Sequence, residues 1–117
     1  MKHRSFNYVR TFRQRHALSE EELATLINQR SASAVSHFEL GDRVPNLEGA
    51  LALQIVFGLA PREMFPGFFE VVEEGVMRRA KRLYERLEGR TDARSQAKRD
   101  LLDEMPGRWR EGNDEAP

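Results

Sequence analysis

The chain has 117 residues, with 19 basic and 19 acidic side chains, 39% hydrophobic residues and no cysteine. This length and balance fit one folded domain, and they exclude a disulfide scaffold, a thiol nucleophile and a cysteine-based metal site. No apolar stretch approaches the ~20 residues that cross a bilayer, and the charged N-terminus lacks the apolar part of a signal peptide, so we expect a cytoplasmic protein without a membrane span.

Capping signals divide the first two thirds of the chain into five short helices. Ser5 can cap a first helix, and the run Ser19-Glu20-Glu21-Glu22 is a capping box that opens a second. Gly41 and Gly58 stand where C-cap glycines end the third and fourth helices, and Pro61 suits the first position of a fifth. The predicted helices cover residues 6–16, 20–28, 32–40, 47–57 and 61–65.

Apolar residues at helical spacing give these helices a face for a common core. The fourth helix is apolar nearly all round, so we predict that it is the central core helix. The inward positions expected in the first three helices are Tyr8, Val9, Phe12, Leu23, Ala24, Ile27, Val35 and Phe38.

A sixth helix is predicted over residues 68–87, because apolar residues recur there in steps of three and four and form one stripe. This stripe either packs on its own domain or pairs with its copy in a dimer. Its residues are Phe69, Val72, Val76, Ala80, Leu83 and Leu87.

The composition changes after this helix, since residues 89–117 contain no Val, Ile, Phe or Tyr. Residues 92–105 form at most a weak helix, and we expect most of the segment to be disordered. Trp109 is a candidate anchor for a protein partner in this tail.

Basic residues are concentrated at the front of the chain. Residues 1–16 contain no acid, so an anionic partner is expected there; the alternative is a solvated first helix. The basic residues of this segment are Lys2, Arg4, Arg10, Arg13 and Arg15.

The second and third predicted helices have the pattern of a helix-turn-helix. In that motif the second helix lies in the DNA major groove, so it needs one buried face and one short polar face that lets the backbone approach the bases. Val35 and Phe38 provide the buried face. Ser36 alternatively packs against backbone, and His37 alternatively is exposed without a contact. The residues expected to face bases are Gln29, Arg30, Ser31, Ser33, Ser36 and His37.

Residues 8–66 resemble the Xre / lambda-repressor-like helix-turn-helix family. The resemblance implies a five-helix domain that binds DNA as a dimer and regulates transcription, usually by repression; some relatives are antitoxins that repress their own operon. The matching residues are Arg13, Leu18-Ser19-x-x-x-Leu23-Ala24, Val35-Ser36-x-Phe38-Glu39-x-Gly41-x-Arg43-x-Pro45, Leu47 with Ala50-Leu51-Ala52, and Leu59-Ala60-Pro61-Arg62-Glu63-Met64-Phe65.

Two features depart from the family. Glu20 stands where many members have a Gln that reaches DNA, and because a carboxylate repels phosphate we expect Glu20 to serve only the helix start. The turn between the two helices is one residue longer than usual and lacks the customary Gly; Asn28 can take the positive φ in its place.

The resemblance also assigns a role to Arg13, and the other two arginines are considered beside it. Arg13 and Glu39 match a pair that links the first helix to the third, which implies a partly buried ion pair with one edge of Arg13 left for phosphate. Arg10 and Arg43 are expected to contact phosphate, with plain solvation as the alternative.

The sequence therefore predicts an all-α protein: a five-helix lambda-repressor-like DNA-binding domain in residues 1–66, a C-terminal extension helix in 67–88 and a mostly disordered tail in 89–117. We expect a homodimeric repressor that binds double-stranded DNA at an inverted repeat. The alternative is a protein-interaction module or antitoxin-type partner that binds through residues 68–87 or the tail. No motif of an enzyme or cofactor site occurs, and the three histidines lie at no metal-ligand spacing.

Overall fold

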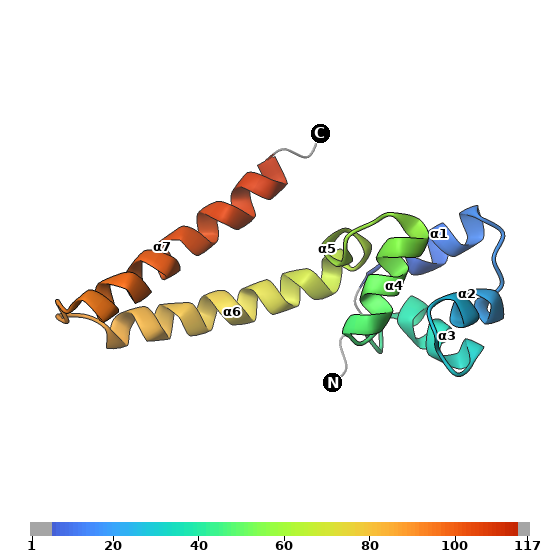
Figure 1. Cartoon of the computed structure of the whole chain (residues 1–117), viewed down its shortest axis with the longest axis horizontal. Helices are drawn as coiled ribbons and strands as arrows, with labels where there is room; N and C mark the ends of the chain where they lie inside the picture. The colour runs from blue at the N-terminus through green and yellow to red at the C-terminus, as the bar shows by residue number, and fades with distance from the viewer. Residues whose placement is uncertain (1–5, 115–117) are drawn as a thin grey trace. The chain divides into compact units, whose positions relative to one another are not determined.

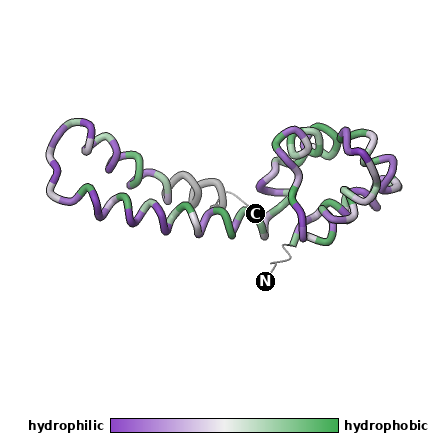
Figure 2. The backbone as a smooth tube through the Cα atoms, turned by 90° about the horizontal axis from the view of Figure 1, so that it is seen from below, coloured by the Kyte–Doolittle hydropathy of each residue, from purple (hydrophilic) through white to green (hydrophobic). Residues whose placement is uncertain are grey.

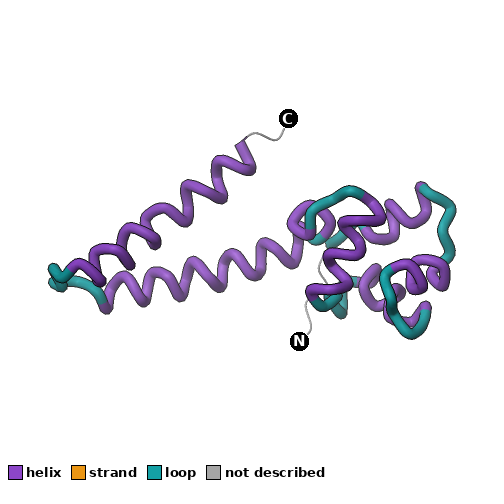
Figure 3. The backbone as a smooth tube through the Cα atoms, viewed as in Figure 1, coloured by secondary structure: helices purple, strands orange, loops and turns teal. Residues whose placement is uncertain are grey.

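The computed structural model describes the backbone of residues 6–114 and the side chains of residues 6–106. Helices joined by loops make up these residues, and no strand occurs among them (Figure 3). The predicted all-α class is thereby confirmed. None of the helices in the described range is both long enough and apolar enough to cross a membrane. In order, Figure 1 shows α1 (Val9–Arg15), α2 (Glu20–Leu26), α3 (Ala32–Leu40), α4 (Leu47–Phe57), α5 (Pro61–Met64), α6 (Pro66–Arg86) and α7 (Ala93–Asp114).

The chain divides into two compact units, Met1–Val72 and Glu73–Pro117. The first unit holds a single apolar core to which each of its first five helices contributes. Six of the eight inward positions predicted from the sequence are buried there; Phe12 is only half-buried and Tyr8 is 37% exposed. The buried core residues are Val9, Leu23, Ala24, Ile27, Val35, Phe38, Leu53, Met64 and Phe65.

The first helix begins later than the sequence indicated, at Val9 instead of residue 6. Ser5, the predicted cap, lies outside the described residues. Asn7 holds this start instead, because its side-chain oxygen accepts a hydrogen bond from the Val9 N–H at 3.1 Å while its amide donates to the Phe38 carbonyl at 2.8 Å. The second bond reaches across the fold, so local capping signals did not indicate it.

The prediction that the fourth helix is central to the core is wrong. In α4 only Gly49 and Leu53 are buried, whereas Leu47 is 74% and Ile55 84% exposed. The helix is apolar on both faces, but only one face meets the other helices. The outer face of α4 is therefore an apolar surface of the first unit.

The second unit contains most of α6 together with α7. The expectation that residues 89–117 are mostly disordered is wrong for the described part, because α7 runs from Ala93 to Asp114. Asp92 caps this helix through bonds from the Ser95 N–H at 3.1 Å and the Ser95 hydroxyl at 2.7 Å. Residues 93–105 are mostly good helix formers, and the helix continues through Pro106. The side chain of Trp109, the predicted anchor, lies outside the described side chains.

Candidate nucleic-acid interface

The start of α2 is fixed by the predicted capping box. The Glu22 N–H donates to the Ser19 hydroxyl at 3.0 Å, and the Ser19 N–H donates to the Glu22 carboxylate at 2.8 Å. These two bonds favour the charged carboxylate and hold the pKa of Glu22 below its ordinary value. The helix therefore begins at a defined residue, which sets the position of the turn that follows it.

The turn from α2 to α3 is closed by Asn28, as the sequence predicted. Asn28 has a φ of 58°, and its N–H donates to the Thr25 carbonyl at 3.3 Å, while the Gln29 N–H donates to the Ala24 carbonyl at 2.8 Å. This pair of bonds is a Schellman motif, in which an αL residue ends the helix and reverses the chain. The turn delivers α3 against α2, where Val35 and Phe38 are buried.

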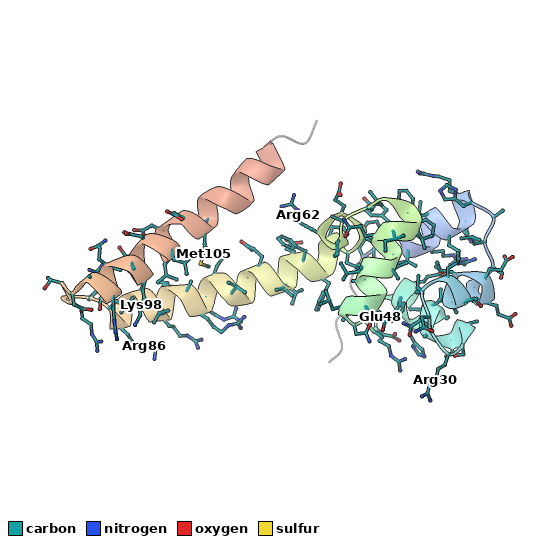
Figure 4. All side chains as sticks on the ribbon, in the orientation of Figure 1. Arg30, Glu48, Arg62, Arg86, Lys98 and Met105 are labelled. Carbon is teal, nitrogen blue, oxygen red and sulfur yellow. The ribbon has the colours of Figure 1, made fainter. Side chains whose placement is uncertain are left out.

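The N-terminal part of α3 presents a short, polar and cationic face. Arg30, Ser31 and Ser33 are exposed, whereas Gln29 and Ser36 are half-buried. Figure 4 shows the Arg30 side chain extending away from the helices. Ser31 is the N-cap of α3 and makes no side-chain capping bond. Residues 29–38 contain no acid.

His37, one of the residues expected to face bases, has a hydrogen-bond partner within the protein. Its Nδ1 lies 3.0 Å from an oxygen of Asp42, and its side chain is 42% exposed. The expectation of an exposed His37 without any contact is therefore wrong. Asp42 was not singled out in the sequence, although the C-terminal turn at Gly41 brings position 42 back towards position 37. His37 now links α3 to the loop that carries Arg43.

Arg13 and Glu39 form the ion pair that the family resemblance implied. The Arg13 Nε donates to one carboxylate oxygen of Glu39 and Nη2 to the other at 3.1 Å, while Nη1 donates to the Leu18 carbonyl at 3.0 Å. The two side chains are only 13% and 7% exposed. The hydrogen bond with Glu39 raises the pKa of Arg13, so this guanidinium stays charged. The pair fixes α3 relative to α1.

A hollow of about 260 Å³ lies beside this ion pair, between α1, the start of α2 and α3. Arg10 is exposed at its edge, and Ser36 contributes from α3. Glu20 lines the same hollow and its charge raises the pKa of Arg13, so its role is not limited to the helix start as the sequence suggested. The hollow thus combines two arginines with two carboxylates, and one of those carboxylates is already paired.

Arg43, the remaining predicted phosphate contact, is exposed in the loop after Gly41. The described residues include no group of three His, Asp or Glu side chains that could hold a metal ion. Compared with protein-family models, curated proteins and solved structures, the chain gives no match.

Proposed function

We propose that the first unit binds double-stranded DNA in a sequence-specific manner, as a five-helix domain of the lambda-repressor-like kind. In this proposal α3 enters the major groove with Arg30, Ser31, Ser33, Ser36 and Gln29 towards the base edges. The protein acts as a homodimer on an inverted repeat and represses transcription by blocking the promoter, without any catalytic step.

One observation carries this proposal: the exposed face of α3 is acid-free and made of small polar residues, while its other face is buried and braced by the Arg13–Glu39 pair. Small side chains let a helix backbone approach base edges closely, and Arg30 is long enough to donate two hydrogen bonds to a guanine. The bracing matters because base contacts require a fixed helix position.

Phosphate contacts would flank this face. Arg43 lies beyond one end of α3, and Arg10 lies at the hollow that Arg13 and Ser36 also line. Contacts of this kind position a protein on the duplex without reading sequence, and they make binding depend on salt. His37 contributes through its bond with Asp42, which holds the loop that carries Arg43.

The test is fluorescence anisotropy with a labelled duplex from directly upstream of the gene, with a random duplex as competitor at two salt concentrations. Arg30→Ala should relax sequence preference by about 1–3 kcal/mol at one base pair, whereas Arg43→Ala should weaken binding to all sequences and flatten the salt dependence. Arg62→Ala is the matched control, since Arg62 is exposed on α5 and lies over the Phe69 ring. Unchanged preference in Arg30→Ala would contradict the assigned role of α3.

A second candidate function, binding of a protein partner, is favoured by a different surface of the same unit. An apolar groove of about 230 Å³ is lined by residues of the loop before α4, of α4, of α5 and of the start of α6, among them Val44, Ala50 and Phe68. Exposed apolar surface of this kind is typical of interaction sites. Absence of any sequence-specific DNA binding in the anisotropy test would favour this function.

A further inference from the structure

His37 lies on the face of α3 that the proposed function turns towards DNA. It stands four positions after the exposed Ser33, and residues four apart share one side of a helix. The buried Val35 and Phe38 lie on the other side. Figure 2 shows hydrophilic and hydrophobic residues alternating along the helices of the first unit, as expected for helices with one open and one buried side. The His37 side chain is 42% exposed, so part of its ring is open to an outside partner.

One nitrogen of this ring is already bonded within the protein. Nδ1 lies 3.0 Å from an oxygen of Asp42, in the loop after α3, and the Asp42 side chain is only 20% exposed. An ionised carboxylate only accepts hydrogen bonds, so Nδ1 carries the proton that joins the two groups. A neutral imidazole has one N–H, and its other nitrogen then holds a lone pair. Asp42 therefore makes Nε2 of His37 a hydrogen-bond acceptor whenever the ring is neutral.

An acceptor on this face distinguishes among the groups that DNA presents. Phosphate oxygens, guanine N7 and O6, and thymine O4 are acceptors themselves, so none of them bonds to a nitrogen lone pair. The donors of the major groove are the exocyclic amines, N6 of adenine and N4 of cytosine. Arg30, the long side chain at the start of the same interface, is a pure donor and fits guanine. The two residues thus have opposite hydrogen-bonding characters.

We propose that His37 is a specificity-determining residue that reads an exocyclic amine of adenine or cytosine through Nε2, and that Asp42 is the positioning residue that sets its tautomer. This inference deepens the proposed function and rests on it. It gives His37 a role besides holding the loop of Arg43. It also gives the Asp42 carboxylate a use at a surface that otherwise favours cations.

Fluorescence anisotropy tests the base contact, with the duplex that the wild-type protein selects from a random library. The measurements are made at about pH 8.5, where a histidine side chain is ordinarily neutral. Each adenine in turn is replaced by purine and each cytosine by 2-pyrimidinone, because these analogues lack the exocyclic amine. At one position of each half-site this loss should weaken wild-type binding about 2- to 10-fold, the effect of one hydrogen bond. The analogue that does so tells adenine from cytosine, and His37→Ala should show no such loss there.

Asp42→Ala tests the positioning role, because Asp42 acts only through His37 in this proposal. Without the carboxylate either ring nitrogen can carry the proton, so the effect of the missing amine at the same position should shrink. Glu48→Ala, which removes one exposed carboxylate on α4, is the matched control and should keep the full effect. Nitrogen NMR of the histidine ring without DNA should show the proton on Nδ1 in the wild type and in Glu48→Ala, and both tautomers in Asp42→Ala.

The failure of this inference differs from the failure of the proposed function. A proton on Nε2 in the wild type, an effect of every amine that is the same in wild type and His37→Ala, or an unchanged effect in Asp42→Ala would each overturn the inference, while sequence-specific binding stands. The base analogues leave the protein unaltered, so a folding defect cannot imitate these results. A wild-type protein that selects no sequence from the library would overturn the proposed function and this inference with it.

Discussion

The Arg13–Glu39 pair allows a quantitative prediction about how α3 is held. Glu39→Ala removes both carboxylate oxygens that accept hydrogen bonds from Arg13, and it leaves that guanidinium only 13% exposed with the Leu18 carbonyl as its remaining partner. Breaking a buried ion pair on one side costs about 3–5 kcal/mol. Because Arg13 keeps the bond to Leu18 and some solvent access, we expect about 3 kcal/mol, a large share of the ~5–15 kcal/mol typical of a domain.

Amide hydrogen exchange at the buried Val35 and Phe38 is the suitable assay, since it reports the first unit separately from the second. Glu48→Ala, a matched loss of one exposed carboxylate on α4, should change stability by less than about 1 kcal/mol. Replacing both partners, Arg13→Met with Glu39→Met, should cost less than the sum of the two single changes, because no charge is then left unpaired. Additive costs, or a Glu39→Ala protein as stable as the wild type, would refute the reasoning.

Two further predictions concern the helix ends that position α1 and α2. Ala17 and Asn28 follow α1 and α2 with nearly equal φ values of 57° and 58°. Asn tolerates this left-handed region, whereas Ala is strained in it. Ala17→Gly should therefore raise the free energy of unfolding, measured by urea denaturation, by about 0.5–1 kcal/mol, and Asn28→Gly should raise it by less. The second prediction concerns pH. The bonds with Ser19 lower the pKa of Glu22 on folding, so they stabilise the folded protein fully above the pKa of Glu22 in the unfolded chain, about 4.3. This stabilisation is lost as the pH falls through the pKa of Glu22 in the folded protein. The difference in unfolding free energy between wild type and Ser19→Ala should accordingly narrow below about pH 4. A difference that stays constant from pH 7 to pH 3 would show that the charged Glu22 carboxylate does not stabilise this helix start.

Features determined by neighbouring residues could be predicted from the sequence. The bounds of α3 and α4 agree with the prediction because their ends depend on local groups, such as Asn46, whose side chain accepts from the Gly49 N–H at 2.9 Å, and Gly41 with a φ of 80°. The same holds for the capping box at Ser19 and the αL conformation of Asn28. Each of these depends on residues within five positions of one another.

Features determined by distant residues could not be predicted in the same way. Asn7 starts α1 while its side chain donates to the Phe38 carbonyl, a contact across 31 positions. The composition of α4 indicated burial but not which face is buried, so the exposure of Ile55 could not be read from the sequence. In the candidate site, Glu20 was assigned from its own helix, whereas its place beside Arg10 and Arg13 depends on how α1 packs against α2 and α3.

The proposed DNA-reading surface at α3 is too small to give specificity in a single copy of the chain. In one copy, only Arg30 and Gln29, in the turn before α3, are long enough to form a forked contact with a base, and each contact is worth about 1–3 kcal/mol of discrimination. Specific DNA-binding proteins prefer their sites over random DNA by about 4–10 kcal/mol, so one such helix is insufficient and two half-sites are needed. The proposed homodimer would supply the two-fold axis that an inverted repeat requires. Loss of dimerisation should therefore lower affinity for the inverted repeat while each copy keeps its base preference. Loss of Arg30 should instead lower affinity for the preferred sequence more than for random DNA, so that base preference is relaxed.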